Sequence, residues 1–159
     1  MINKCIIVAL IGLLGILIGK YVSNKLVIKN KYSKDLLAFC DYFKNEMFFK
    51  QTKLFKVIAD YKFTSEELKK DFADFLSSKV DGQPITIGKI FEENVRTKYN
   101  EFFNSLGRFD INTQSEVLDK QRQVLQDIAI NFENKVKKEG SLYVKLGFLF
   151  GICLGVLVI

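Results

Sequence analysis

Long apolar segments lie at both ends of the chain, and a region of mixed polar and apolar residues separates them. The first covers Ile2–Val22, about 21 residues, if Lys4 and Lys20 extend their ammonium groups to opposite membrane interfaces. At about 1.5 Å per residue, a helix of this length spans the roughly 30 Å hydrocarbon core of a bilayer. The pattern predicts an N-terminal transmembrane anchor over residues 1–24. The alternative is a cleaved signal peptide, but no suitable small-residue cleavage site follows the segment.

The second apolar segment, Leu142–Ile159, contains one charged residue, Lys145. Its length and composition predict a C-terminal transmembrane helix over residues 141–159. A lipid-anchor signal is the alternative, and it would need small residues and a polar spacer before the apolar tail. Here a lysine-rich helical segment leads directly into the tail.

The net charge of +6 comes from lysines at the inner ends of the two apolar segments. Residues 35–134 hold 17 acidic and 14 basic side chains, a net charge of −3, which argues against a nucleic-acid partner. The positive-inside rule therefore places the middle of the chain in the cytoplasm and both termini outside. The same lysines are suited to anionic lipid headgroups. They are Lys20, Lys25, Lys29, Lys31, Lys34, Lys135, Lys137, Lys138 and Lys145.

Glycines recur on one face of each predicted span. Small residues at this spacing let membrane helices approach closely, because lipid supplies no hydrophobic drive for association. Two interpretations remain open: the two spans of one chain pack as a hairpin, or the glycine faces pair with a partner or with a second copy in a homo-oligomer. The glycines are Gly12, Gly15, Gly19, Gly147, Gly151 and Gly155.

The region between the spans, residues 25–140, shows helical periodicity throughout. One apolar stripe begins at Tyr32, a short helix follows around Leu54–Tyr61, and a third helix begins at a Thr64-x-x-Glu67 capping box and runs to about Lys79. Many of the 15 phenylalanines fall on these stripes and are expected in a core. The predicted fold is all-α, a compact bundle of five to six cytoplasmic helices flanked by the two spans.

The second half of this region follows a turn at Asp81-Gly82-Gln83-Pro84. A helix is predicted from Ile87 to Leu106, with a break near Arg96 left open, and Gly107 as its cap. A second capping box, Thr113-x-x-Glu116, opens a helix with no breaker before Gly140, so we predict one long helix that continues into the second span. A coiled coil is the competing interpretation of its apolar seam, which consists of Val117, Leu118, Leu125, Ile128, Phe132 and Val136.

This sequence lacks the side chains and motifs that most enzyme mechanisms use. There is no histidine, no phosphate-binding loop, no dinucleotide-binding glycine motif and no metal-ligand spacing. The acidic pairs Glu66-Glu67 and Glu92-Glu93 are best explained as favourable charges in the first turns of helices. Three free, buried thiols are expected at Cys5, Cys40 and Cys153. We therefore expect a non-enzymatic protein without catalytic residues, metal or cofactor.

Several local motifs, in this order along the chain, resemble the stage III sporulation protein AB family. The segment Asn45–Tyr61 looks like that family's Glu-Ile-x-Tyr and Pro-Leu region, with Lys53 in place of the proline. The Leu-Gly, Asp and Gln signature is matched by Leu106, Gly107, Asp110 and Gln114, and the entry to the final span by Tyr143, Leu146, Gly147 and Gly151. The four signature residues mark either a partner surface or a turn that holds two helices together.

The resemblance implies a cytoplasmic domain like the F domain of type II secretion and type IV pilus platform proteins, a six-helix bundle. It also implies a place in the mother-cell membrane around the forespore, in the channel complex of endospore formation. The implied partners are a cytoplasmic secretion-type ATPase like stage III sporulation protein AA, other channel membrane subunits and membrane lipid. The alternatives are a platform subunit of a secretion or pilus system and a membrane-tethered scaffold with no transport role.

Overall fold

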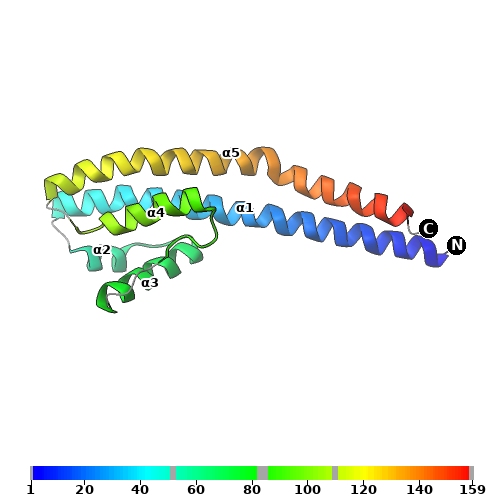
Figure 1. The fold of residues 1–159 in the computed structure, drawn as a ribbon, viewed down its shortest axis with the longest axis horizontal. Helices are drawn as coiled ribbons and strands as arrows, with labels where there is room; N and C mark the ends of the chain where they lie inside the picture. Colours follow the sequence, from blue (N-terminus) through cyan, green and yellow to red (C-terminus); the bar gives the residue numbers. More distant parts are fainter. Residues whose placement is uncertain (1, 51–52, 82–85, 109–110, 158–159) are drawn as a thin grey trace. The chain divides into compact units, whose positions relative to one another are not determined.

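The computed structural model describes residues 2–50, 53–81, 86–108 and 111–157, and within these ranges the chain is helical without any strand (Figure 1). The all-α prediction is confirmed. The predicted Asp81–Pro84 turn lies mostly outside the described residues. The helices are α1 (Ile2–Lys50), α2 (Leu54–Asp60), α3 (Glu66–Asp81), α4 (Glu93–Ser105) and α5 (Ile111–Leu157).

The helices form two compact units. The first, here called the helix pair, contains residues 1–30, which include the start of α1, together with residues 131–159, which include the end of α5. The second, here called the bundle, contains residues 31–130. Both long helices therefore contribute to both units, and α2, α3 and α4 belong to the bundle alone.

An aromatic cluster forms the core of the bundle. The ring of Phe72 on α3 lies 4.4 Å from that of Phe39 on α1 and 4.5 Å from that of Phe103 on α4, measured between centroids. Such aromatic pairs contribute about 0.5–1.5 kcal/mol each beyond their buried area. The predicted stripes supply the fully buried side chains, which include Tyr32, Leu36, Phe39, Phe43, Phe72, Tyr99, Phe102, Phe103 and Leu118.

Helix α1 runs without interruption from the predicted N-terminal anchor into the stripe that begins at Tyr32. The sequence indicated these as separate features. They form one helix because no glycine or proline occurs between Lys20 and Lys50. Helix α5 is also unbroken through Gly140, as predicted. It begins at Ile111, so Thr113 is its third residue and not its N-cap, and the second predicted capping box starts three residues too late.

Among the described residues, one helix is long and apolar enough to cross a membrane, α1 over Leu10–Met47. Only 11% of its most apolar 18-residue window is buried, whereas the core helix of a soluble protein would be mostly buried. A signal sequence near an N-terminus satisfies the same criteria of length and composition. The predicted C-terminal span lies in α5, where the side chains from Leu154 onward are outside the described set.

The prediction of a helix from Ile87 was wrong. Helix α4 starts at Glu93 and is continuous through Arg96, so the suggested break is absent. Residues 87–91 form a turn in which Gly88 has a positive φ of 68° and the Phe91 N–H donates to the Gly88 carbonyl at 2.9 Å. The side chains of Ile87 and Phe91 are buried although both residues lie in this turn. Their spacing therefore marks buried positions and not a helix.

The first predicted capping box is displaced by one residue. Ser65 caps α3, because its hydroxyl oxygen accepts a hydrogen bond from the Leu68 N–H at 3.4 Å. Thr64 instead donates its N–H to the Asp35 carboxylate at 2.8 Å. Glu66 and Glu67 do lie in the first turn of α3, as expected.

Of the predicted buried thiols, Cys40 is buried and Cys153 is exposed. The expectation for Cys153 was wrong because this part of α5 has one neighbouring helix, so its other faces stay uncovered. The side chain of Cys5 lies outside the described set.

Candidate functional site: a glycine-lined helix pair and the turn after α4

Glycines allow the two helices of the pair to touch through their backbones. A Cβ atom added to Gly15 would collide with the carbonyl oxygen of Gly147, and one added to Gly147 would collide with the carbonyl oxygen of Gly15. A Cβ on Gly151 would lie 2.9 Å from the Cα of Gly12. These contacts are made between α1 and α5 of one chain. The surroundings of Gly155 lie outside the described set.

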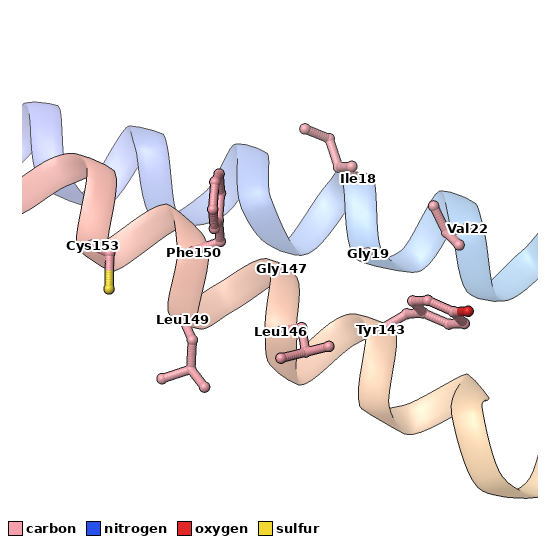
Figure 2. A pocket seen from close by; sticks show the side chains of 9 residues that line it. All are labelled: Ile18, Gly19, Val22, Tyr143, Leu146, Gly147, Leu149, Phe150 and Cys153. Carbon is pink, nitrogen blue, oxygen red and sulfur yellow. The ribbon is translucent and has the colours of Figure 1, made fainter.

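An open apolar groove runs along this glycine contact (Figure 2). Its volume is about 500 Å³. Gly19 and Gly147 contribute no side chain to it, while larger side chains stand around them in Figure 2. The lining residues are Ile18, Gly19, Val22, Tyr143, Leu146, Gly147, Leu149, Phe150 and Cys153.

The nine lysines of the predicted topology signal lie on the surface of α1 and α5. Some of those in the helix pair make local contacts: the ammonium of Lys25 lies 4.6 Å from the centre of the Tyr21 ring, and Lys137 pairs with Glu133 at 2.6 Å. Lys20, Lys25, Lys31, Lys34, Lys137, Lys138 and Lys145 are exposed, and Lys29 and Lys135 are partly exposed.

The turn after α4 is held by contacts with two other helices. Gly107 has a positive φ of 67°, the conformation in which glycine ends a helix, so its prediction as a cap is confirmed. Its Cα faces the side chain of Leu54 on α2, because an added Cβ would come within 3.0 Å of it. The Leu106 carbonyl accepts a hydrogen bond from the Lys79 ammonium at 3.1 Å. Leu106 itself is fully buried.

Gln114 is the exceptional member of the predicted signature. Its side chain is 0% exposed, yet neither its amide nitrogen nor its amide oxygen has a hydrogen-bond partner in the described structure. Leaving such a group unpaired costs about 1–3 kcal/mol. Asp110 lies outside the described residues. Of the described signature residues, Leu106 and Gln114 are fully buried, whereas Gly107 is exposed in the turn.

A partly buried polar network ties α1 and α3 to the turn before α4, and sequence reasoning missed it. The Tyr32 hydroxyl donates to the Asp71 carboxylate at 2.6 Å, and the Gly88 N–H donates to the same oxygen at 2.8 Å. Burial raises the pKa of Asp71 above its usual value of 3.8, although these two hydrogen bonds act in the opposite direction. Burial also raises the pKa of Tyr99, whose hydroxyl bonds to that of Ser33 at 2.7 Å.

A second carboxylate, that of the buried residue Asp35, organises the entry to α3. It accepts hydrogen bonds from the Tyr61 hydroxyl at 3.0 Å and from the backbone N–H groups of Thr64 and Ser65 at 2.8 Å each. The available signal was the position of Asp35 beside Leu36 on the apolar stripe of α1. Both networks fix loops between helices, which is a structural task. In the part of the chain that the structure describes, no group of His, Cys, Asp or Glu side chains could hold a metal ion.

The fold and these sites together define a class: an all-helical protein in which an aromatic bundle shares its two long helices with a glycine-packed apolar helix pair. A family model for stage III sporulation protein AB matches residues 4–159 of this chain. The chain belongs to that family, which confirms the resemblance indicated by its sequence motifs. It is therefore a sporulation-stage III protein, and the family is not known as an enzyme family. No curated protein and no solved structure matches the chain.

Proposed function

We propose that this protein is a non-enzymatic platform in the mother-cell membrane, within the channel complex that connects the mother cell to the forespore. Its bundle, which resembles an F domain, lies in the cytoplasm and receives movement from a secretion-type ATPase like stage III sporulation protein AA. The movement passes to the other membrane subunits of the channel through the helix pair. Family membership over nearly the whole chain supports the sporulation role.

The continuity of α5 is the observation that carries the coupling. Leu118 and Leu125 of this helix are buried in the bundle, and Gly147 and Gly151 of the same helix contact α1 in the helix pair. No break occurs between Ile111 and Leu157. A single helix can transmit a displacement along its axis, whereas a flexible linker absorbs it.

The proposed topology places both helices of the pair across the membrane. The lysines at the inner ends of the apolar segments favour a cytoplasmic bundle with both termini outside. The exposure of the apolar side chains on both helices supports lipid contact: Leu13 and Leu17 of α1, and Leu146 and Leu149 of α5, are each more than half exposed. Such a surface would be unfavourable in water.

Proline substitutions in α5 test the coupling. Ile128→Pro breaks the helix at a cost of about 3 kcal/mol or more, but it also removes a buried side chain. Lys138→Pro breaks the helix at an exposed position beyond the bundle, so it leaves the core intact. We expect both variants to reduce heat-resistant spores to the level of a gene deletion, with development stopped after engulfment and vegetative growth normal.

The matched controls are Ile128→Val and Lys138→Ala, which keep the helix and should sporulate normally. Normal spore yield from Lys138→Pro, with the variant present in the membrane, would contradict mechanical coupling through α5. A defect in secretion during vegetative growth would instead favour a secretion or pilus platform. Normal sporulation of a strain that lacks the gene would leave the membrane-tethered scaffold as the remaining hypothesis.

A further inference from the structure

The length of the groove along α5 is close to the thickness of the hydrocarbon layer of one membrane leaflet. Its lining residues on α5 extend from Tyr143 to Cys153, ten steps along the helix. At about 1.5 Å per step this is about 15 Å, half of the roughly 30 Å hydrocarbon core. One acyl chain of a phospholipid occupies the same depth. The volume of about 500 Å³ lies within the range of small-molecule sites, about 300–1,000 Å³.

Among the described residues, positive charge lies near one end of this groove. Lys20 follows Gly19 directly in sequence, and Lys145 lies between Tyr143 and Leu146, so both come from the end of the groove nearer the bundle segments of the chain. Both lysines are exposed. The Tyr143 hydroxyl at this end donates to the Glu139 carboxylate at 3.0 Å, as suits a tyrosine at the headgroup level. Beyond Tyr143 the lining residues bear no charge.

We propose that the groove binds one acyl chain of an anionic phospholipid, whose headgroup is held by Lys20 and Lys145. This proposal rests on the membrane placement in the proposed function. The glycines that bring the two helices together also leave the space that the acyl chain fills. The lysines add selectivity for an anionic headgroup over a zwitterionic one, because each basic residue near the surface strengthens such binding roughly fivefold.

Charge favours lipid over a second copy of this chain as the occupant. A parallel copy seated in the groove would bring its own Lys20 and Lys145 to the same membrane interface, where like charges repel. An anionic headgroup neutralises these lysines instead.

A single tryptophan reports on the groove, since the natural sequence contains none. Leu149→Trp places it in the groove, and Leu14→Trp places it outside the groove. These positions are matched in exposure, 56% and 58%. They are also matched in depth, because Gly12 and Gly15 contact Gly151 and Gly147. The full chain would be reconstituted in vesicles of phosphatidylglycerol and phosphatidylcholine at equal mole fractions, with one lipid brominated on its acyl chains at a time.

We expect brominated phosphatidylglycerol to quench the Leu149→Trp variant more strongly than brominated phosphatidylcholine, and the Leu14→Trp variant to show no such preference. Adding Lys20→Gln and Lys145→Gln should lower the preference, roughly fivefold per lysine. Equal quenching by both lipids at both positions would overturn the groove site while leaving the membrane placement intact. No quenching at either position would overturn the membrane placement itself.

The substituted tryptophan could fill part of the groove, so the unsubstituted chain gives an independent measurement. Native mass spectrometry from mixed-lipid micelles should show a retained phosphatidylglycerol adduct that the double lysine variant loses. Equal retention of phosphatidylcholine would count against the proposal.

Discussion

The helix pair and the bundle use opposite means to hold helices together. In the bundle, large aromatic side chains such as Phe72 and Phe103 fill the space between helices. In the helix pair, Gly15 and Gly147 have no side chain, and the backbones themselves meet. The bundle also buries polar groups, Asp35 among them, whereas apolar side chains of the helix pair remain exposed. A core that excludes water favours large buried side chains, and the proposed membrane placement would account for the small residues and exposed apolar side chains of the helix pair.

Truncation of a core aromatic residue should have the largest effect, and it should be confined to the bundle. Phe103 is fully buried and contacts Phe72 and Phe75. Phe103→Ala should lower the free energy of unfolding of the bundle by about 3–5 kcal/mol. Urea denaturation of the full chain in detergent, followed by circular dichroism, measures the loss. Hydrogen exchange then locates it.

Phe55→Ala is the matched control, since Phe55 is 53% exposed on α2 and should change stability by less than about 0.5 kcal/mol. If Phe103→Ala accelerated exchange in the helix pair as much as in the bundle, the two units would not be separate.

Adding a methyl group at the glycine contact should disturb the helix pair alone. The Cβ of Gly147→Ala would collide with the backbone of Gly15, which cannot rotate away as a side chain can. Overpacking of this kind costs about 1–3 kcal/mol. We expect a longer distance between spin labels placed at Leu10 and Ile152, in a background without native cysteines, measured by pulsed electron spin resonance.

Gly12→Ala provides the control, because an added Cβ at Gly12 meets nothing within 4 Å. The label distance should not change in this variant. An unchanged distance in Gly147→Ala would mean that the close glycine contact does not hold the pair together.

Replacing Gln114 should stabilise the bundle, in contrast to the two changes above. Its amide is fully buried without a hydrogen-bond partner among the described residues, so Gln114→Met removes a desolvation cost while keeping a similar shape. The expected gain is on the order of 1 kcal/mol. The same urea experiment measures it, with Gln126→Met as the exposed control.

Spore counts give the Gln114→Met experiment a second result. A stabler bundle with fewer heat-resistant spores would indicate that the amide serves the channel complex at the expense of stability. A less stable bundle would mean that the amide has a stabilising partner.

The sequence predicted which faces are buried better than where helices start. Apolar spacing correctly indicated burial of Leu118, Leu125 and Ile128. The same kind of spacing at Ile87 and Phe91 arises from a turn. This turn is held by a hydrogen bond from the Gly88 N–H to the Asp71 carboxylate, and the two residues are 17 positions apart in the sequence. Local periodicity carries no information about such a bond.

For the candidate site, glycine spacing predicted a close approach of helices. It left open whether the paired glycines belong to one chain or to two. The four-residue signature was expected to mark a partner surface or a turn. Local sequence could not show that Gln114 would be buried with no hydrogen-bond partner among the described residues. Burial of a polar side chain depends on neighbours that are distant in sequence. The groove was also not predicted, since it needs both helices side by side.

The smallest expected effect is a pH dependence of the stability of the bundle. Because burial raises the pKa of Asp71 above 3.8, the folded state favours the protonated carboxyl. Its contribution to stability is therefore fully present below pH 3.8 and is lost as the pH rises through the higher pKa of the folded state. Asp71→Asn removes this titration while its amide oxygen can still accept hydrogen bonds from Tyr32 and Gly88. We expect the stability of the variant relative to the natural protein to increase between pH 4 and pH 7.

Thermal unfolding of both proteins across this pH range measures that difference. A constant or falling difference for Asp71→Asn would mean that the hydrogen bonds from Tyr32 and Gly88 outweigh the burial of the carboxylate. In either case the helix pair should not respond, because its packing at Gly15 and Gly147 is made by uncharged backbone.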